Sequence, residues 1–201
     1  LPVDIFGPER QNSRGVDFSN REQRVQLQQE LVQIEKKSWT AGPLIAGQLI
    51  KTNDVLNVIS PQDTHKIVGT VYQATENEVQ QALNAAEKAK NAWANSPVNE
   101  RAACLERFAD LLQQHEHEFL TLACLEAGKT LNDGVAEVRE AIDFCRYYAQ
   151  LARKTLAQPH QFTGYTGETN ELSLHPRGII LCISPWNFPL AIFTGQVVAA
   201  L

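Results

Sequence analysis

The residues with the clearest chemical potential lie in one short loop near the C-terminal end of the sequence. Residues 183–190 read Ile-Ser-Pro-Trp-Asn-Phe-Pro-Leu, so two prolines stiffen a segment that carries one carboxamide, Asn187, between two aromatic residues. A carboxamide held rigidly in such a place can donate a hydrogen bond to a developing oxyanion. The alternative is a rigid loop whose Trp186 and Phe188 only cap the core, and general physics leaves both interpretations open.

The elements on either side of this loop strengthen the first interpretation. Residues 179–183 form a continuous apolar run that follows Gly178, and this predicts a strand buried on both faces, as in a parallel sheet. A helix is expected from about Leu190 to the end of the sequence. Strand, loop and helix in this order begin a βαβ unit, and open α/β sheets bind ligands at the carboxyl ends of their strands.

The preceding sequence predicts mainly helices. Apolar periodicity indicates helices over residues 21–37, 76–95, 99–127 and 133–156. The pattern is compatible with a break in the third of these helices near His115. Thr75 and Glu78 match a capping box, and Gly128 suits a helix end. A hairpin is expected from strands over residues 55–59 and 66–73, a half-exposed strand over residues 171–175, a polar arm over residues 1–20 and a loop over residues 40–50.

Composition excludes several classes of protein. Of the 201 residues, 43% are hydrophobic and 20% are charged, which is typical of a globular protein rather than a disordered one. The net charge of -5 argues against a nucleic-acid-binding surface, which is usually basic. No apolar run approaches the ~20 residues that span a bilayer, and no secretory signal is present. Methionine is absent, which favours a piece of a larger chain over a processed protein that happens to lack it.

The cysteines and histidines do not indicate a metal or redox site. Cys104, Cys124, Cys145 and Cys182 form no CxxC pair, so we expect four reduced, mostly structural thiols and a cytoplasmic location. The histidines at positions 115 and 117 are two residues apart and would face different directions on a helix, so they are expected to be solvated. No metal site is therefore predicted.

The loop at residues 185–189, Pro-Trp-Asn-Phe-Pro, resembles the aldehyde dehydrogenase superfamily, in which it follows the first strand of the dinucleotide-binding domain. Residues 126–129 (Glu-Ala-Gly-Lys) and 146–149 (Arg-Tyr-Tyr-Ala) look like the same superfamily. Residues 7–15, 41–45 and 138–144 resemble, more narrowly, the dehydrogenase domain of the bifunctional proline utilisation A family of bacteria. Together these segments extend the resemblance over the whole sequence.

This resemblance implies an α/β fold in which an N-terminal helical layer packs beside the start of a Rossmann-like NAD-binding sheet. It divides the sequence into a lead-in arm and helix (residues 1–45) and the first part of the NAD-binding domain (residues 46–157). An oligomerisation hairpin (residues 158–177) would follow, and then the first strand, the loop and the helix start (residues 178–201). A homo-oligomer is therefore expected for the longer protein.

The implied activity is the NAD-dependent oxidation of L-glutamate γ-semialdehyde, the open form of pyrroline-5-carboxylate, to glutamate. By the match, Asn187 is the oxyanion donor. Ile183, Ser184, Pro185 and Trp186 would line the nicotinamide end of the NAD site. Phe188 would flank the aldehyde, and Glu140 would receive the substrate's ammonium group, although without the match a solvated surface carboxylate is an equal interpretation of Glu140.

The same resemblance places the nucleophilic cysteine and the general-base glutamate beyond residue 201, so residues 1–201 alone are predicted to be inactive. Cys182 is a poor substitute, because a thiol buried in an apolar strand forms little thiolate. FAD is expected only in a separate proline dehydrogenase domain. No nucleic acid is expected to bind this segment, and peripheral membrane association of the longer protein stays open. The alternatives are an aldehyde dehydrogenase with another substrate and a non-catalytic helical interaction module.

Overall fold

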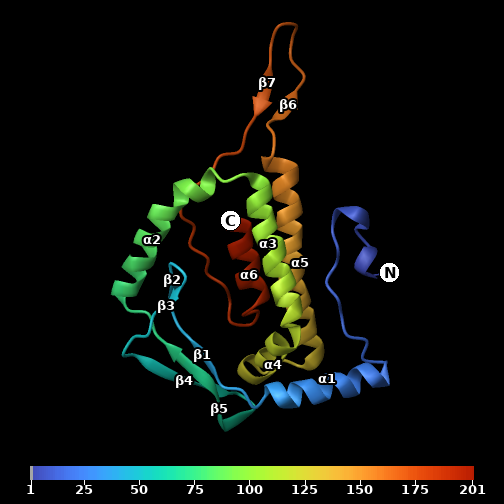
Figure 1. The fold of residues 1–201 in the computed structure, drawn as a ribbon, viewed down its shortest axis with the longest axis vertical. Coiled ribbons are helices and arrows are strands. Elements are labelled where there is room, and N and C mark those ends of the chain that lie inside the picture. Colours follow the sequence, from blue (N-terminus) through green and yellow to red (C-terminus); the bar gives the residue numbers. More distant parts are fainter. Residues whose placement is uncertain (1) are drawn as a thin grey trace.

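The centre of the molecule is a helical layer built on two long helices, α3 (Val98–Gln114) and α5 (Leu131–Leu156), with the C-terminal α6 (Ala191–Ala200) against α5 (Figure 1). The computed structural model describes residues 2–201. Small side chains at the contacts let the helices approach closely, as Ala102, Ala109, Ala141 and Ala149 are fully buried. The core is completed by Leu105, Leu112, Val138, Ile142, Cys145 and Val198.

Local signals in the sequence fix the helix ends. α2 (Glu76–Ala94) begins with the predicted capping box, in which Glu78 accepts from the Thr75 backbone N–H at 2.9 Å. The predicted break at His115 is also confirmed, because α3 ends there and α4 (Glu116–Ala127) begins. Gly128 then ends α4 with a φ of +66°, a left-handed conformation that glycine adopts at little cost.

A small mixed sheet lies beside the helices, in the order β1-β5-β4. The predicted hairpin is confirmed as β4 (Val55–Ser60) antiparallel to β5 (Asp63–Tyr72). The expectation of a loop over residues 40–50 is wrong, because β1 (Trp39–Ala41) pairs in parallel with β5, and β2 (Leu44–Ile45) pairs with β3 (Gln48–Leu49). A partner 30 residues away stabilises β1, and such a contact leaves no local signal.

The expectation of a buried strand over residues 179–183 is also wrong. The segment forms no β-ladder, and Leu181 and Ile183 are 82% and 75% exposed. A strand needs a neighbour to satisfy its backbone groups, and within residues 2–201 no strand lies beside this segment. Cys182 is accordingly half-buried outside any strand, not enclosed in one.

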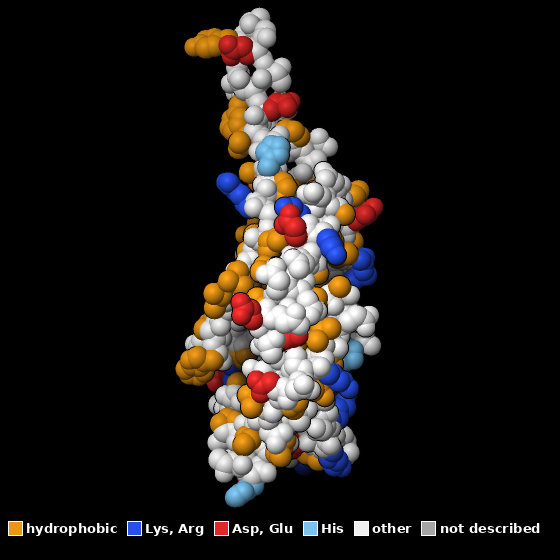
Figure 2. All heavy atoms as spheres, turned by 90° about the vertical axis from the view of Figure 1, so that its left-hand side faces the viewer, with side chains coloured by type: hydrophobic (Ala, Val, Ile, Leu, Met, Phe, Trp, Pro, Cys, Tyr) orange, Lys and Arg blue, Asp and Glu red, His pale blue; other side chains and the backbone are white. Residues whose placement is uncertain are grey.

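A narrow hairpin of β6 (His160–Phe162) and β7 (Asn170–Leu172) extends from the end of α5. It projects from the body of the molecule as a thin finger (Figures 1 and 2). All six strand residues are exposed, so β7 is shorter and less buried than the strand expected over residues 171–175. An exposed two-stranded ribbon of this kind is only marginally stable by itself.

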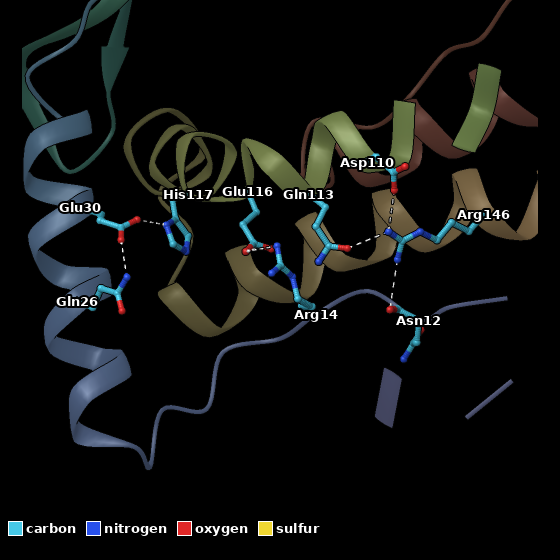
Figure 3. A network of polar contacts seen from close by, with 9 residues as sticks. All are labelled: Asn12, Arg14, Gln26, Glu30, Asp110, Gln113, Glu116, His117 and Arg146. Carbon is cyan, nitrogen blue, oxygen red and sulfur yellow. Dashed lines mark hydrogen bonds and ion pairs between the residues drawn. The ribbon is translucent and has the colours of Figure 1, made fainter. Parts of the chain in front are cut away.

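The N-terminal segment begins with the short 3-10 helices η1 (Pro2–Asp4) and η2 (Gly7–Glu9) and then lies along the helical layer. The carboxylate of Asp143 on α5 accepts from the backbone N–H and the hydroxyl of Ser13, at 2.7 and 2.8 Å. Arg146 donates to the Asn12 carbonyl oxygen at 3.3 Å and to the Gln113 side chain at 2.9 Å (Figure 3). The polar arm is thus docked on α5.

Helix α1 (Arg21–Ile34) packs on α4 through a second polar contact (Figure 3). The Glu30 carboxylate lies against Nδ1 of His117 and accepts from the Gln26 amide at 3.0 Å. The Gln26 hydrogen bond first, and then the His117 contact, lower the pKa of Glu30 from its ordinary value of 4.5. The expectation of a solvated His117 is therefore wrong, while His115 is exposed as expected.

Candidate active-site loop and groove

The loop 185–190 faces a groove between the C-terminal end of α4 and the start of α5. Its volume is about 930 Å³. The walls are formed by the β4–β5 turn, helix α4, the α4–α5 connection with the start of α5, and the loop itself. The lining residues are Pro61, Phe119, Leu122, Ala123, Glu126, Ala127, Gly128, Lys129, Thr130, Asp133, Trp186, Asn187, Pro189 and Leu190.

Two of the residues predicted to do chemistry line this groove. Asn187 is exposed, so its carboxamide is open to a ligand, and Trp186 beside it is 88% exposed. A tryptophan side chain this exposed is unusual in a folded protein and leaves a large apolar surface uncovered. The arrangement offers a hydrogen-bond donor next to an apolar wall, which suits a ligand with both a polar centre and a flat ring.

The other predicted residues are distributed around the loop. Ile183 and Pro185 are exposed, and Ser184 is half-buried, in the extended segment that leads to the groove. Phe188 is 38% exposed, and its ring lies 4.5 Å from the Lys129 ammonium. Glu140 is exposed on α5 and is not among the described residues that line the groove. The structure thus brings Trp186 and Asn187 together at the groove but leaves Glu140 outside it.

A buried ion pair behind the loop was missed by the sequence reasoning. Lys129 Nζ lies 2.9 Å from Glu137 Oε2, and the two side chains are 13% and 0% exposed. Glu137 Oε1 also accepts from the backbone N–H groups of Leu190 at 2.8 Å and Ala191 at 3.3 Å. One feature of the sequence could have indicated this ion pair. Glu137 is a charged residue on the apolar side of a predicted helix, one position before the buried Val138.

The thiols and histidines assemble no reactive site in the part of the chain that the structure describes. Burial raises the pKa of the Cys145 thiol to about 12 and also raises the pKa of Cys124, so both are held as neutral thiols near neutral pH. All four cysteines are free. Within residues 2–201, no cluster of acidic, histidine and cysteine side chains could hold a metal ion, and no helix is long and apolar enough to cross a membrane.

Comparison of the sequence with known proteins identifies a family that it matches and several similar proteins. Residues 49–201 match the sequence profile of the family described as "Aldehyde dehydrogenase family". The sequence is 40% identical over its whole length to the bifunctional protein PutA of Salmonella typhimurium and of Escherichia coli, but it spans only 14% of each of those proteins. It is also 37% identical over 186 residues to a 1-pyrroline-5-carboxylate dehydrogenase of Bacillus pumilus, covering 92% of this chain and 36% of that protein.

Solved structures show the same similarity in three dimensions. Proline utilization A from Bdellovibrio bacteriovorus superposes with a TM-score of 0.88 at 30% identity, over 95% of this chain and 20% of that one. A variant of 1-pyrroline-5-carboxylate dehydrogenase from Thermus thermophilus gives a TM-score of 0.83 at 33% identity, over 94% of this chain and 38% of that one. The predicted α/β fold of the dehydrogenase type is thereby confirmed, and the chain belongs to the aldehyde dehydrogenase family.

Proposed function

We propose that this sequence forms the N-terminal part of a dehydrogenase domain that oxidises L-glutamate γ-semialdehyde to glutamate with NAD. The relative named 1-pyrroline-5-carboxylate dehydrogenase supports this substrate, and the relatives named bifunctional protein PutA support a longer chain with two activities. A proline dehydrogenase unit with FAD would then lie elsewhere in the same longer protein. Below, "the complete enzyme" means a protein in which this sequence continues through a whole aldehyde dehydrogenase domain.

The observation that carries the proposal is the position of Asn187. Its exposed carboxamide lines the groove at the start of α6. In the complete enzyme a cysteine thiolate attacks the aldehyde carbon, the C=O bond becomes a C–O⁻ single bond, and the Asn187 N–H donates to this oxyanion. A thioester would remain once the former aldehyde hydrogen has left this adduct as hydride, and a glutamate would then activate the water that hydrolyses the thioester. Both of those residues are assigned to the part of the enzyme that follows residue 201.

The family implies a nicotinamide cofactor, which accepts the hydride when it is bound. The residues present fit its flat ring, because Ile183 and Trp186 offer exposed apolar surface immediately before Asn187. Ser184 and Pro185 would complete this wall. NAD rather than NADP is the cofactor we propose.

Glu140 is the proposed partner of the substrate's ammonium group, because an ammonium entering a cleft favours a charge-assisted hydrogen bond. Its exposure on α5 leaves the carboxylate free to receive such a group. An aldehyde dehydrogenase for an uncharged substrate is the remaining alternative. The alternative of a non-catalytic helical module has lost its support, because the chain belongs to a family of enzymes.

For the longer protein we propose a cytoplasmic homo-oligomer that acts on a small aldehyde. Four free cysteines favour a reducing compartment. The exposed β6–β7 hairpin supplies a surface suited to subunit contact.

The proposal is tested by measuring NADH formation from the semialdehyde by the complete enzyme and its Asn187→Ala variant. We expect turnover to fall by ~10²- to 10³-fold, because the variant loses one oxyanion donor. Asn84→Ala, an asparagine change on the remote helix α2, serves as the matched control and should keep wild-type turnover. Wild-type enzyme without semialdehyde-dependent NADH formation would refute the assigned activity, and undiminished turnover in Asn187→Ala would refute the assigned role.

A further inference from the structure

The buried carboxylate of Glu137 requires an explanation that the proposed function does not give. A charge that is withdrawn from water is strongly destabilising unless it is paired and hydrogen-bonded. Glu137 meets this need through Lys129 on one oxygen and two backbone N–H groups on the other. A hydrophobic residue would fill the same space in the core without the cost of burying a charge. The contribution of Glu137 therefore lies in its polar contacts.

The two N–H groups belong to the point where the loop becomes a helix. Leu190 is the last loop residue and Ala191 begins α6, and no side chain within α6 caps that end. The first N–H groups of a helix lack intrahelical partners, and a carboxylate there is also favoured by the helix dipole. Glu137 therefore caps α6 from a different helix and fixes the end of the loop to α5.

Lys129 provides a second contact between the ion pair and the loop. Its ammonium lies 4.5 Å from the centre of the Phe188 ring, within the range of a cation–π interaction. On the other side of the loop, the Gln196 amide donates to the Ile183 carbonyl oxygen at 2.9 Å. Asn187 is thus held between one fixed point before it and two after it.

We propose that Glu137, together with Lys129, is a positioning residue that sets the direction of the Asn187 carboxamide in the groove. This inference rests on the proposed role of Asn187 as oxyanion donor. Neither side chain of the pair needs to touch the substrate, because the pair acts through Phe188, Leu190 and Ala191. A misplacement of about 1 Å in such a donor can cost ~10²-fold in rate.

The test compares Glu137→Gln with the wild type in the complete enzyme. Glutamine keeps the shape of the side chain but removes its charge and turns an NH₂ group toward Lys129 or toward the backbone N–H groups. We expect turnover to fall by about 10- to 100-fold while the KM for NAD stays near the wild-type value. Glu78→Gln is the matched control, since Glu78 is also buried and accepts a backbone N–H, but on the remote helix α2.

Two further measurements separate positioning from simple destabilisation. The double variant Glu137→Gln/Asn187→Ala should be no slower than Asn187→Ala alone, because both changes remove the same oxyanion interaction. Amide hydrogen exchange of residues 186–191 should be faster in Glu137→Gln, and also in Lys129→Met if the glutamine variant fails to fold. Exchange does not depend on activity, so it tests the positioning even if the wild-type enzyme does not oxidise the semialdehyde.

Unchanged turnover in Glu137→Gln, or fully additive losses in the double variant, would overturn the inference while leaving the proposed activity intact. Unchanged exchange in residues 186–191 would overturn it as well. A wild-type enzyme with no semialdehyde oxidation, combined with faster exchange in the variant, would instead support the positioning contact and refute the proposed function.

Discussion

At the scale of single residues, Asn187 is the polar group of the loop that lines the groove, whereas Glu140 lies outside the groove. Asn187 offers a neutral donor at its edge, and Glu140 offers a negative charge on the exposed side of α5. The sequence identified both, but for different reasons. The loop that carries Asn187 has an unusual composition, whereas Glu140 stands out from other surface carboxylates only by resemblance to a family.

The role of Glu140 is open to a direct test with two substrates. In the complete enzyme, Glu140→Ala should lower kcat/KM for the semialdehyde by about 10- to 100-fold, because a hydrogen bond to a charged group contributes ~1.5–3 kcal/mol. An uncharged aldehyde such as propanal should be affected far less. Glu76→Ala, an exposed glutamate change on α2, is the control. Equal losses for both aldehydes would remove the support for an ammonium-binding role.

At the scale of elements, most of the structure follows from local rules. The apolar periodicity, the Thr75–Glu78 capping box and the left-handed Gly128 place the helices close to their predicted bounds. Contacts between elements are less local. The contact between Glu30 on α1 and His117 on α4 joins residues that are 87 positions apart, and no sequence pattern in either helix predicts it.

The Glu30 carboxylate makes the stability of α1 and of its packing on α4 dependent on pH, first through the hydrogen bond from Gln26 within α1 and then through the contact with His117. The pKa of Glu30 is lower in the folded chain than its ordinary value of 4.5, so the unfolded chain binds more protons at acid pH. The stabilisation is therefore complete above about pH 4.5 and is lost as the pH falls through the lowered pKa. Because the pair is partly exposed, we expect the effect to remain below about 1 kcal/mol.

Urea unfolding of the 201-residue chain at several pH values measures this dependence. The Glu30→Gln variant should lose less stability than the wild type between neutral and acid pH, because its side chain does not titrate. Glu22→Gln, on the same helix, is the control and should follow the wild-type curve. Parallel curves for wild type and Glu30→Gln would contradict the assigned contribution.

At the scale of the whole molecule, two exposed features are not covered by another strand or helix within residues 2–201. One is the apolar segment 179–183, and the other is the β6–β7 hairpin that projects from the body (Figure 1). Exposed apolar surface and open strand edges favour association. We expect the first to be covered by further strands of the sheet and the second by another subunit of the complete enzyme.

The hairpin can be removed without cutting into the helical core. Replacing residues 160–172 by a short Gly-Ser connection in the complete enzyme should reduce the molar mass measured by light scattering, because a subunit contact is lost. The helical circular dichroism signal should stay the same, since all six strand residues of the hairpin are exposed. An unchanged molar mass with intact helices would contradict a role in oligomerisation.

The sequence by itself determined the helices, their caps, the β4–β5 hairpin and the loop that carries Asn187, because each depends on residues that are close together along the chain. Only the tertiary structure decided the pairing of β1 with β5 and the exposure of residues 179–183. It also revealed the contact of Glu137 with Leu190 across 53 positions. Burial and pairing depend on what the rest of the chain places alongside a residue, and neither periodicity nor composition contains that information.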